Sequence, residues 1–585
     1  MCGIAAIFSF QDNALRVDAG ELDAIRDHMT PRGPDGAGSW VAKDGAIGLA
    51  HRRLAIIDLS DGAAQPMEID GGRYRITFNG EIYNYRALRD DLLAKGVQFK
   101  TQSDTEVVAW LYAMHGESAV SRLRGMFAFA IWDETKRGLF VARDPLGIKP
   151  LYYADDGKTF RAASQVKALI AGGKVETAPD PAGHVGFFLF GHVPEPHTLY
   201  NEIHALPAGH TLWVDSRGVR ALKCYFDVPG TLSAGANGAP DVSLRDAVLD
   251  SIRHHLVADV PVGVFLSSGI DSTVIAALAS EIHGAGLNTI TLAFAEFAGT
   301  AMDEAPLAEE VARACNASHQ MKVVSRHDFL DAREHILESM DQPSIDGVNT
   351  YFVARAAAET GLKVALSGLG GDELFGGYDT FRQVPKLVGM LDGIPGMGAL
   401  GRAFRVVSAP VAKRLTSPKF AGLLEYGTRY GDAYLLRRGL YAPWELPDVL
   451  DPDFAAQGWQ TLEARQRLEN THNRIPDPRQ KIAALEMCFY MRNQLLRDAD
   501  WAGMAHSLEI RVPLVDGALL RALGQKAFSK TDLAATPATA LPKSVLNKPK
   551  TGFFIPVQDW LTEKPNAVSR GYRGWAGDVY KAFRC

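Results

Sequence analysis

The chain has 585 residues, more than one hydrophobic core usually holds, so we expect at least two domains. Its hydrophobic content of 47% and charged content of 22% are those of a folded globular protein and argue against intrinsic disorder. The net charge of −6 gives no basic excess to attract duplex nucleic acid, so we expect no nucleic-acid partner.

The cysteines and the apolar segments further limit the class of protein that the sequence predicts. Five scattered cysteines without a C-x-x-C pair indicate neither a disulfide framework nor a zinc site. No basic segment leads into an apolar run at the N-terminus, and no apolar run is long enough to span a bilayer. We therefore expect a cytoplasmic enzyme without a membrane partner.

The chain begins Met1-Cys2-Gly3-Ile4, and removal of Met1 would leave a thiol and an α-amine on one residue. An α-amine with a pKa of about 7.7–8.0 can accept the thiol proton near neutral pH. Cys2 is thus a candidate nucleophile that carries its own base. The alternative, an ordinary second residue, stands unless the following segments supply a substrate site.

The first part of the chain has the pattern of a strand-rich domain with few helices. Short apolar runs separated by Gly, Asp and Asn predict strands at Ala46–Ala50, Tyr74–Phe78, Phe127–Trp132, Leu139–Ala142 and Leu151–Tyr153. Asn79 and Gly80 follow the second of these runs, and an amide beside a close-approaching backbone N–H could form an oxyanion hole.

Two further segments offer charges that would recognise an amino acid. Arg53 directly precedes the apolar run Leu54–Ile57, an expected strand, and could clamp a carboxylate. The acids in Ser103–Glu106 could bind an ammonium group. Each segment also has a structural interpretation, because Asn-Gly is a common turn, paired arginines are usually solvated, and Ser-Asp-Thr-Glu is typical of a helix cap.

The order of these segments resembles the class II glutamine amidotransferase domain. The motifs that carry the resemblance are Met1–Ile4, Arg32–Gly36, the segment around Arg53, Asn79–Asn84, Ser103–Glu106 and Arg143–Tyr153. The resemblance implies an N-terminal-nucleophile hydrolase fold, an αββα sandwich, that hydrolyses glutamine to glutamate and ammonia. It implies that Cys2 is the nucleophile, that Asn79 and Gly80 form the oxyanion hole, and that Arg53, Glu81 and Asp104 bind glutamine.

A Gly-, Pro- and Ala-rich stretch at 228–241 predicts a linker between a domain at 2–227 and a domain at 242–585. Beyond it, apolar runs at Val262–Leu266, Thr289–Phe294 and Val364–Leu366 alternate with helical patterns, which predicts an α/β parallel sheet. From about Pro385 the apolar spacing is helical and no strand is apparent. The expected fold class is therefore an α+β αββα domain followed by an α/β domain with a helical C-terminal part.

Two Gly/Ser turns follow strands of the expected parallel sheet. Ser267–Ser272 leads into a helical pattern from Thr273 to Ser280, and such a turn cradles anions with backbone N–H groups. It resembles the pyrophosphate loop of ATP pyrophosphatases, usually S-G-G-x-D-S, with Ser268 in place of the first Gly. The second turn ends in Asp372, which with Asp271 could hold Mg²⁺ at the carboxyl edge of the sheet.

Residues 498–516 and 548–553 extend the resemblance to the glutamine-dependent asparagine synthetases over nearly the whole chain. The resemblance implies ATP and Mg²⁺ as cofactors, Lys550 as the lysine that stabilises phosphate charge with Lys548 as its competitor, and a possible homodimer. It implies adenylation of a small carboxylate, aspartate being favoured, and an enclosed passage for ammonia. The implied ATP-binding residues are Leu266, Ser267, Ser268, Gly269, Asp271, Ser272, Ser367 and Gly368, and the implied metal ligands are Asp271 and Asp372.

One position departs from the family pattern. Leu369 stands where asparagine synthetases generally have an acid, in the third place of S-G-E-G-x-D-E. Asp346 could compensate, the acceptor could be another carboxylate on a sugar or peptide, or the difference could be neutral. A cyclase joining an amine and a carboxylate within one substrate, and a non-catalytic sensor or scaffold, are the alternatives to an amide ligase.

Overall fold

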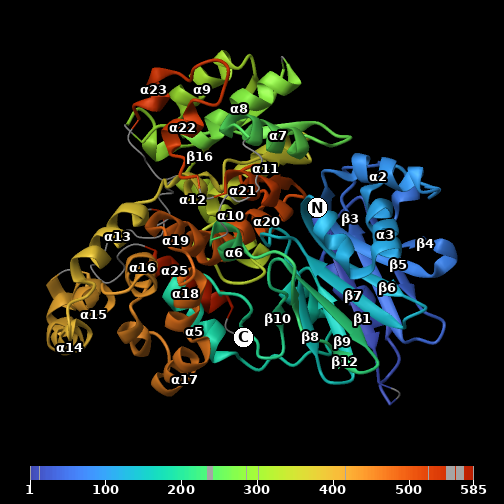
Figure 1. Cartoon of the computed structure of the whole chain (residues 1–585), viewed down its shortest axis with the longest axis horizontal. Coiled ribbons are helices and arrows are strands. Elements are labelled where there is room, and N and C mark those ends of the chain that lie inside the picture. The colour runs from blue at the N-terminus through green and yellow to red at the C-terminus, as the bar shows by residue number, and fades with distance from the viewer. Residues whose placement is uncertain are drawn as a thin grey trace.

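The computed structural model describes residues 2–11, 13–233, 242–284, 286–300, 302–415, 417–524, 526–548, 560 and 572–583. Two antiparallel sheets form the N-terminal part, and a parallel sheet with many helices forms the rest (Figure 1). Among the described residues, no helix combines the length and the apolar character needed to cross a bilayer.

The N-terminal domain contains two stacked antiparallel sheets. The first has the order β10 (His204–Ala205), β8 (Tyr152–Asp155), β9 (Thr159–Ala163), β1 (Gly3–Ser9), β3 (Ile47–Arg53) and β2 (Gly36–Val41). The second has the order β12 (Gly218–Val219), β11 (His210–Asp215), β7 (Gly138–Arg143), β6 (Gly125–Asp133), β5 (Tyr74–Ile82) and β4 (Met67–Ile69), with β13 (Lys223–Cys224) paired to β11.

Burial on both faces of β1 explains its continuous apolar sequence. Ile4 and Phe8 pack against Ala128 and Trp132 of the second sheet. Ala5 lies on the other side of the strand, in a cluster with residues of the helices that cover this sheet. Those helices are α1 (Ala19–His28) and α4 (Val166–Ala171), and the second sheet is covered by α2 (Tyr85–Ala94) and α3 (Asp104–His115). The expected αββα sandwich is therefore confirmed.

The second domain is built on a five-stranded parallel sheet. Its order is β16 (Ser318–Val324), β15 (Asn288–Phe294), β14 (Val262–Phe265), β17 (Val364–Leu366) and β18 (Glu509–Arg511). The strand order reverses between β14 and β17, and ligands of open α/β sheets bind at the carboxyl edge of that point. Both Gly/Ser turns of the sequence follow these two strands.

Helices cover both faces of this sheet and form the C-terminal part. They are α5 (Pro181–Phe190), α6 (Val228–Ser233), α7 (Leu244–His255), α8 (Ile270–His283), α9 (Ala305–Ala314), α10 (Arg326–Ser339), α11 (Val348–Glu359), α12 (Gly371–Phe375), α13 (Thr380–Leu391), α14 (Met397–Leu415), α15 (Leu423–Tyr426), α16 (Tyr430–Arg438), α17 (Pro452–Leu462), α18 (Ala464–His472), α19 (Pro478–Leu485), the π-helix η8 (Glu486–Leu495), α20 (Leu496–Met504), α21 (Gly517–Leu523), α22 (Lys530–Ala534), α23 (Lys543–Leu546) and α25 (Arg573–Ala582). The helical C-terminal part is confirmed.

The structure adds a helix at the start of the expected linker, and it differs from the sequence in two strand assignments. Val228–Ser233 forms α6 with Val228 and Leu232 buried, so the expected linker begins as a packed helix. β18 lies inside the stretch where no strand was expected, because its three residues pair with β17 and its apolar pattern is too short to stand out. Leu54–Ile57 is buried yet outside any strand, since its apolar side chains pack in the core beyond the end of β3.

Two candidate active sites

Cys2 directly precedes the first residue of β1, and 8% of its surface is exposed. Its backbone nitrogen donates to Asn79 Oδ1 at 2.9 Å, and its Sγ lies 3.9 Å from the Leu54 carbonyl oxygen. Burial raises the pKa of the thiol above its ordinary value, although the Leu54 hydrogen bond opposes the shift. A base close to the sulfur is therefore needed to produce the thiolate.

Asn79 and Gly80 lie inside β5, whereas the sequence placed them after the strand. β5 continues to Ile82, and Asn79 and Gly80 pair with Ala128 and Phe127 of β6. Gly80 has φ 157°, and a Cβ there would lie 2.1 Å from the Met126 carbonyl oxygen, so only glycine fits. Asn79 Nδ2 is buried and has no hydrogen-bond partner among the residues that the structure describes, so it could donate to an oxyanion.

Arg53 is the last residue of β3, not the residue before a new strand. The register pairs Gly3 with Arg52, which brings the end of β3 beside the N-terminus. The Arg53 guanidinium donates to the carbonyl oxygens of Asp58 and Ser60, the latter at 2.8 Å. These two hydrogen bonds fix the orientation of the guanidinium group. The Arg53 side chain remains partly exposed at the site.

Glu81 and Asp104 come together from β5 and the first turn of α3. Asp104 Oδ2 accepts from the Ile82 N–H at 2.9 Å, and burial raises the pKa of Asp104 to about 6. Burial, then Glu509 and Asp104, raises the pKa of Glu81 well above its usual range. Glu81 Oε2 lies 3.6 Å from Arg511 of β18, so this acid faces the second domain as well as the first site.

The helix-cap interpretation of Ser103–Glu106 is confirmed, and the binding of an ammonium group by its acids stays a prediction. Ser103 Oγ accepts from the Thr105 N–H at 3.1 Å and caps α3, and Glu106 accepts from the Lys100 and Thr101 N–H groups. Within this segment, Asp104 is the acid that lies beside Glu81 and the first site, whereas Glu106 holds the loop before the helix.

A buried ion pair links the first site to the second domain. Arg32 Nη1 and Nη2 donate to the Asp500 carboxylate of α20 at 2.6 and 3.0 Å, and Arg32 Nε donates to the Cys2 carbonyl oxygen at 3.1 Å. Arg32 ends the short 3₁₀ helix η1 (Thr30–Arg32). One guanidinium thus bridges the candidate nucleophile and the other domain, and no sequence pattern indicated this contact.

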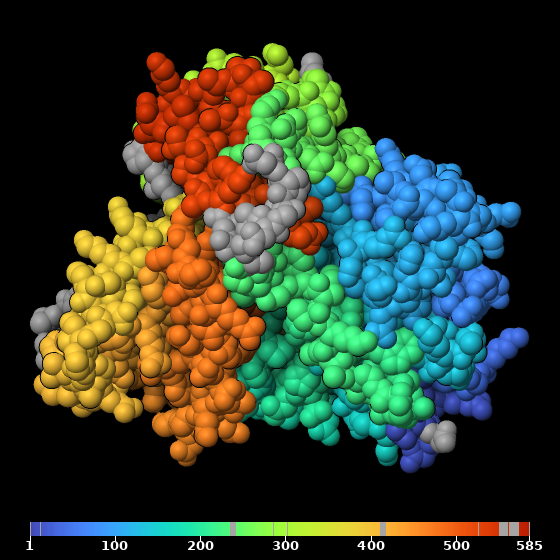
Figure 2. Space-filling model, in the orientation of Figure 1, coloured from blue at the N-terminus to red at the C-terminus, as the bar shows by residue number. Residues whose placement is uncertain are grey.

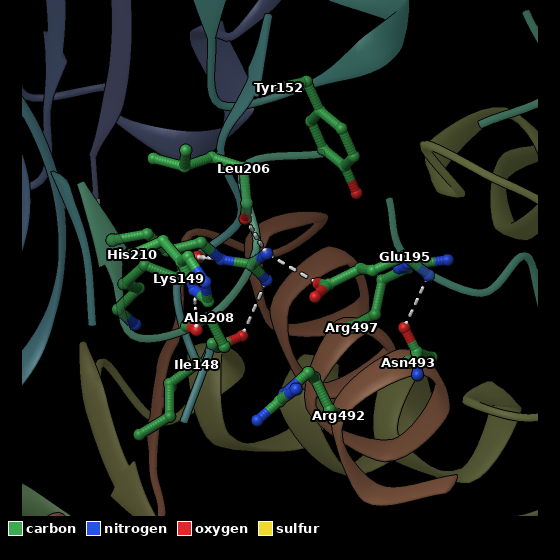
Figure 3. A network of polar contacts seen from close by, with 12 residues as sticks. Ile148, Lys149, Tyr152, Glu195, Leu206, Ala208, His210, Arg492, Asn493 and Arg497 are labelled. Carbon is green, nitrogen blue, oxygen red and sulfur yellow. Dashed lines mark hydrogen bonds and ion pairs between the residues drawn. The ribbon is translucent and has the colours of Figure 1, made fainter. Parts of the chain in front are cut away.

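A second set of polar contacts connects the first domain to η8. Arg143 Nη1 donates to Glu195 Oε1 and to the Leu206 carbonyl oxygen, both at 2.6 Å. The Glu195 N–H donates to Asn493 Oδ1 at 2.9 Å, and Figure 3 shows this contact between Glu195 and Asn493. η8 ends at Leu495, which lines the second cavity. The contact between Glu195 and Asn493 therefore links the first domain to a helix that borders this cavity.

The second site is a cavity of about 580 Å³ at the carboxyl edge of β14 and β17. Eleven residues of the two turns line it: Leu266, Ser267, Ser268, Gly269, Ile270, Asp271, Ser272, Ser367, Gly368, Leu369 and Asp372. α8 begins at Ile270, three residues earlier than expected, so Asp271 and Ser272 lie in its first turn near the anion-binding helix end. A Cβ on Gly371 would lie 2.4 Å from the Asp271 carboxyl carbon, so the two turns meet closely.

Lys530 joins the two candidate metal ligands and was not identified from the sequence. Its Nζ lies 2.5 Å from both Asp271 carboxylate oxygens and 2.8 Å from Asp372 Oδ1. Burial alone would lower the pKa of Lys530, but the two aspartates outweigh burial and raise it. The position of Lys530 at the start of α22, far from both loops in sequence, left no local signal.

Lys548 reaches the cavity, and Lys550 lies outside the described residues. Lys548 Nζ donates to Ser268 Oγ and to Glu304 Oε1, the latter at 3.0 Å. The phosphate role that the family pattern gives to Lys550 therefore stays a prediction.

Leu369 packs its side chain against the main hydrophobic core at the cavity wall. Asp346, the possible substitute acid, is not among the lining residues, and its Oδ1 accepts from the Gly347 N–H at 2.9 Å. Asn349 and Thr350 of α11 line the cavity instead. The cavity wall at Leu369 is therefore neutral.

Similarity to known proteins covers both parts of the chain. A family model described as a glutamine amidotransferase domain matches residues 1–226, and a model described as asparagine synthase matches residues 243–570. The chain is 33% identical to asparagine synthetase [glutamine-hydrolyzing] 1 of Bacillus subtilis over 97% of this chain and 89% of that protein.

Two further relatives have names of the same kind. A putative asparagine synthetase [glutamine-hydrolyzing] of Mycobacterium bovis is 34% identical over 96% of this chain and 88% of its own length. Asparagine synthetase B [glutamine-hydrolyzing] of Escherichia coli is 33% identical over 66% of both chains. The chain therefore belongs to the glutamine-hydrolysing asparagine synthetase family.

Proposed function

We propose that this chain hydrolyses glutamine at Cys2 and uses the ammonia to convert aspartate into asparagine, with ATP split to AMP and pyrophosphate. The observation that carries the proposal is the pairing of two sites in one chain. A buried cysteine faces an unpartnered amide donor in one domain, and two anion-binding turns meet at the strand-order reversal in the other. Asn79, Gly80 and the carboxylate- and ammonium-binding groups Arg53, Glu81 and Asp104 complete the first site.

In the first site, the Cys2 amine, once Met1 is removed, takes the thiol proton, and the thiolate attacks the glutamine side-chain amide. Asn79 Nδ2 and the Gly80 N–H donate to the oxyanion of the tetrahedral intermediate. Ammonia leaves, and water hydrolyses the thioester to glutamate. Asn79 Oδ1 holds the Cys2 nitrogen, which keeps the base beside the sulfur.

In the second site, the aspartate side-chain carboxylate attacks the α-phosphorus of ATP and releases pyrophosphate. Ammonia then attacks the acyl-adenylate, and AMP leaves with the amide formed. Backbone N–H groups of Ser267–Ser272 and the first turn of α8 suit the phosphates. Lys530 and Lys548, with Lys550 from the family pattern, supply positive charge at the cavity.

Asp271 and Asp372 are the residues that would hold Mg²⁺. One ammonium group contacts both carboxylates, so the pair already forms a site for positive charge. Mg²⁺ is usually held by one or two carboxylates together with phosphate oxygens, and this pair would supply the carboxylates. Bound Mg²⁺ would neutralise the charge that develops on the departing pyrophosphate.

The acceptor, the quaternary state and the location extend this proposal. Aspartate is favoured because of the relatives, while the neutral wall at Leu369 leaves a different small carboxylate as the second candidate. A homodimer, a cytoplasmic location and a domain boundary at 228–241 remain parts of the proposal.

A panel of carboxylates tests the acceptor. The purified protein with glutamine, ATP and Mg²⁺ is expected to release pyrophosphate and form an amide when aspartate is added. If aspartate gives no amide while a sugar or peptide carboxylate does, the acceptor is wrong and the two-site mechanism stands. If no carboxylate releases pyrophosphate, the ligase function itself is wrong.

A further inference from the structure

Lys530 lies between the two candidate metal ligands of the second cavity. Its Nζ contacts three carboxylate oxygens, at 2.5 Å from Oδ1 and Oδ2 of Asp271 and at 2.8 Å from Oδ1 of Asp372. Mg²⁺ sites in proteins commonly use one or two carboxylates of this kind. The ammonium group of Lys530 therefore takes the carboxylate contacts that the metal would use.

Two glycines allow these charged groups to lie so close together. A Cβ on Gly371 would lie 2.4 Å from the Asp271 carboxyl carbon, and a Cβ on Gly377 would lie 1.9 Å from Asp372 Oδ1 and 2.8 Å from Lys530 Cε. The backbone thus packs directly against all three side chains. In this cradle an ammonium group and a metal ion would repel each other, so they compete for the same carboxylate oxygens.

The backbone of α22 is anchored, while the Lys530 side chain faces the cavity. Ser529 caps this helix, because its Oγ accepts from the Asp532 N–H and its own N–H donates to Asp532 Oδ2 at 2.7 Å. Leu533 is fully buried in a core shared with α8. Figure 2 shows the red segment that contains α22 packed against the green segment that contains α8. Since a lysine stem has four rotatable carbons, the ammonium group can change partners while the helix stays in place.

Ligands that enter the cavity can reach all three charged groups. The side chains of Lys530, Asp271 and Asp372 line the cavity, and each keeps 20–22% of its surface accessible. Phosphate oxygens attract an ammonium group as carboxylates do, through charge-assisted hydrogen bonds. A nucleotide in the cavity would therefore offer Lys530 a second set of anionic partners.

We infer that Lys530 keeps Mg²⁺ away from Asp271 and Asp372 until a nucleoside triphosphate enters the cavity. The inference rests on the proposed function, which assigns ATP and Mg²⁺ to this cavity. The phosphates draw the ammonium group toward themselves, and both carboxylates become accessible to the metal that accompanies the nucleotide. Metal and nucleotide then bind together, and the resting cavity binds the metal alone only weakly.

Titration of the full chain with Mn²⁺ alone, followed by the electron paramagnetic resonance of the free ion, tests the inference. Mn²⁺ uses the same oxygen ligands as Mg²⁺. Lys530→Gln removes the competing charge, so we expect its Kd for Mn²⁺ to fall about tenfold or more below the wild-type value. Lys530→Met, which keeps an apolar stem, should show the same gain, and Lys530→Arg, which keeps the charge, should not.

The affinity for nucleotide should change in the opposite direction. Lys530→Gln loses a group that phosphate oxygens attract, so it should bind α,β-methylene-ATP about tenfold more weakly than the wild type when a chelator removes all metal. A general loosening of the cavity would not tighten the binding of metal while it weakens the binding of nucleotide. Circular dichroism of each variant checks that it is folded.

Lys548→Gln is the matched control. Lys548 lies in the same cavity but contacts Ser268 and Glu304, so its removal should leave the Kd for Mn²⁺ within about twofold of the wild-type value. The double variant K530Q/D271N should lose the gain, because one of the two carboxylates is gone.

Three results would overturn the inference: equal Mn²⁺ affinity in the wild type and K530Q, an equal gain in K548Q, or a gain that persists in K530Q/D271N. The titrations contain no acceptor and require no turnover. A failure of the proposed ligase reaction would therefore appear in the pyrophosphate assay and leave the metal titration to be judged by itself.

Discussion

At Cys2, two atoms of one residue occupy different environments. The sulfur is buried and its pKa is raised, while the backbone nitrogen is held by Asn79 Oδ1. In the proposed mechanism, activation of the thiol depends on a base fixed beside it, and Asn79 would both orient that base and offer Nδ2 to the oxyanion. This double use of one amide explains why it stands within β5 rather than in a flexible turn.

Asn79→Asp separates the two uses of the amide. The aspartate retains an oxygen that accepts from the Cys2 nitrogen but loses the Nδ2 donor. We expect the glutaminase kcat to fall by about 10²–10³-fold, the usual cost of one oxyanion donor, with ammonium-dependent synthesis unchanged. The steady-state rate of glutamate release measures this kcat. An unaltered kcat would contradict the role of Asn79 as an oxyanion donor.

Glutamine binding should depend on the charge of Asp104. Burial raises the pKa of this acid to about 6, so its carboxylate becomes neutral as the pH falls through that value. Because glutamine keeps its ammonium group there, we expect its KM to rise by about tenfold per pH unit below pH 6. Asp104→Asn should abolish this slope; the same slope in the variant would show that another group titrates.

At the scale of elements, contacts between domains reach the nucleophile directly. α20 supplies Asp500 to Arg32, and Arg32 holds the Cys2 carbonyl oxygen. β18 supplies Arg511 to Glu81. Elements of the synthetase domain thus complete the first site, so the two catalytic centres share a buried polar boundary.

Asp500→Ala would leave the Arg32 guanidinium buried without its carboxylate. Removing one partner of such a pair usually costs about 3–5 kcal/mol, so we expect a loss of that size in the free energy of unfolding. Glutaminase kcat/KM should fall with it. Urea titration measures the stability, and Asp331→Ala, which removes the exposed pair with His327, should change it by only about 0.5 kcal/mol or less. Equal effects would contradict a buried bridge.

Motifs with local chemistry could be predicted from the sequence, whereas residues brought in by tertiary packing could not. Asp271 and Asp372 share a cavity because each follows a strand at the order reversal, a consequence of topology that the apolar runs already implied. Lys530 and Asp500 reach the sites from distant helices. Lys530 has no neighbouring motif, and the 498–516 segment that contains Asp500 gave no indication that Asp500 would contact Arg32. Leu54–Ile57 misled the prediction because burial alone makes an apolar run without strand pairing.

At the scale of the whole molecule, we propose that the glutaminase centre passes ammonia to the synthetase centre. Ammonia in water is mostly protonated at neutral pH, so an efficient transfer needs a protected route across the buried boundary between the domains. The Arg32–Asp500 ion pair and the hydrogen bond between Glu195 and Asn493 both lie on that boundary. We therefore expect the glutamine amide nitrogen itself to become the amide nitrogen of the product.

Isotope transfer tests this claim most directly. The enzyme receives glutamine labelled with heavy nitrogen in its side-chain amide, together with ATP, Mg²⁺, aspartate and an excess of unlabelled ammonium, and the product is analysed by mass spectrometry. We predict asparagine whose amide carries mainly the label, and no labelled product from Cys2→Ala, which should still use ammonium. Unlabelled asparagine from the wild-type protein, formed while labelled ammonium accumulates in solution, would contradict the account.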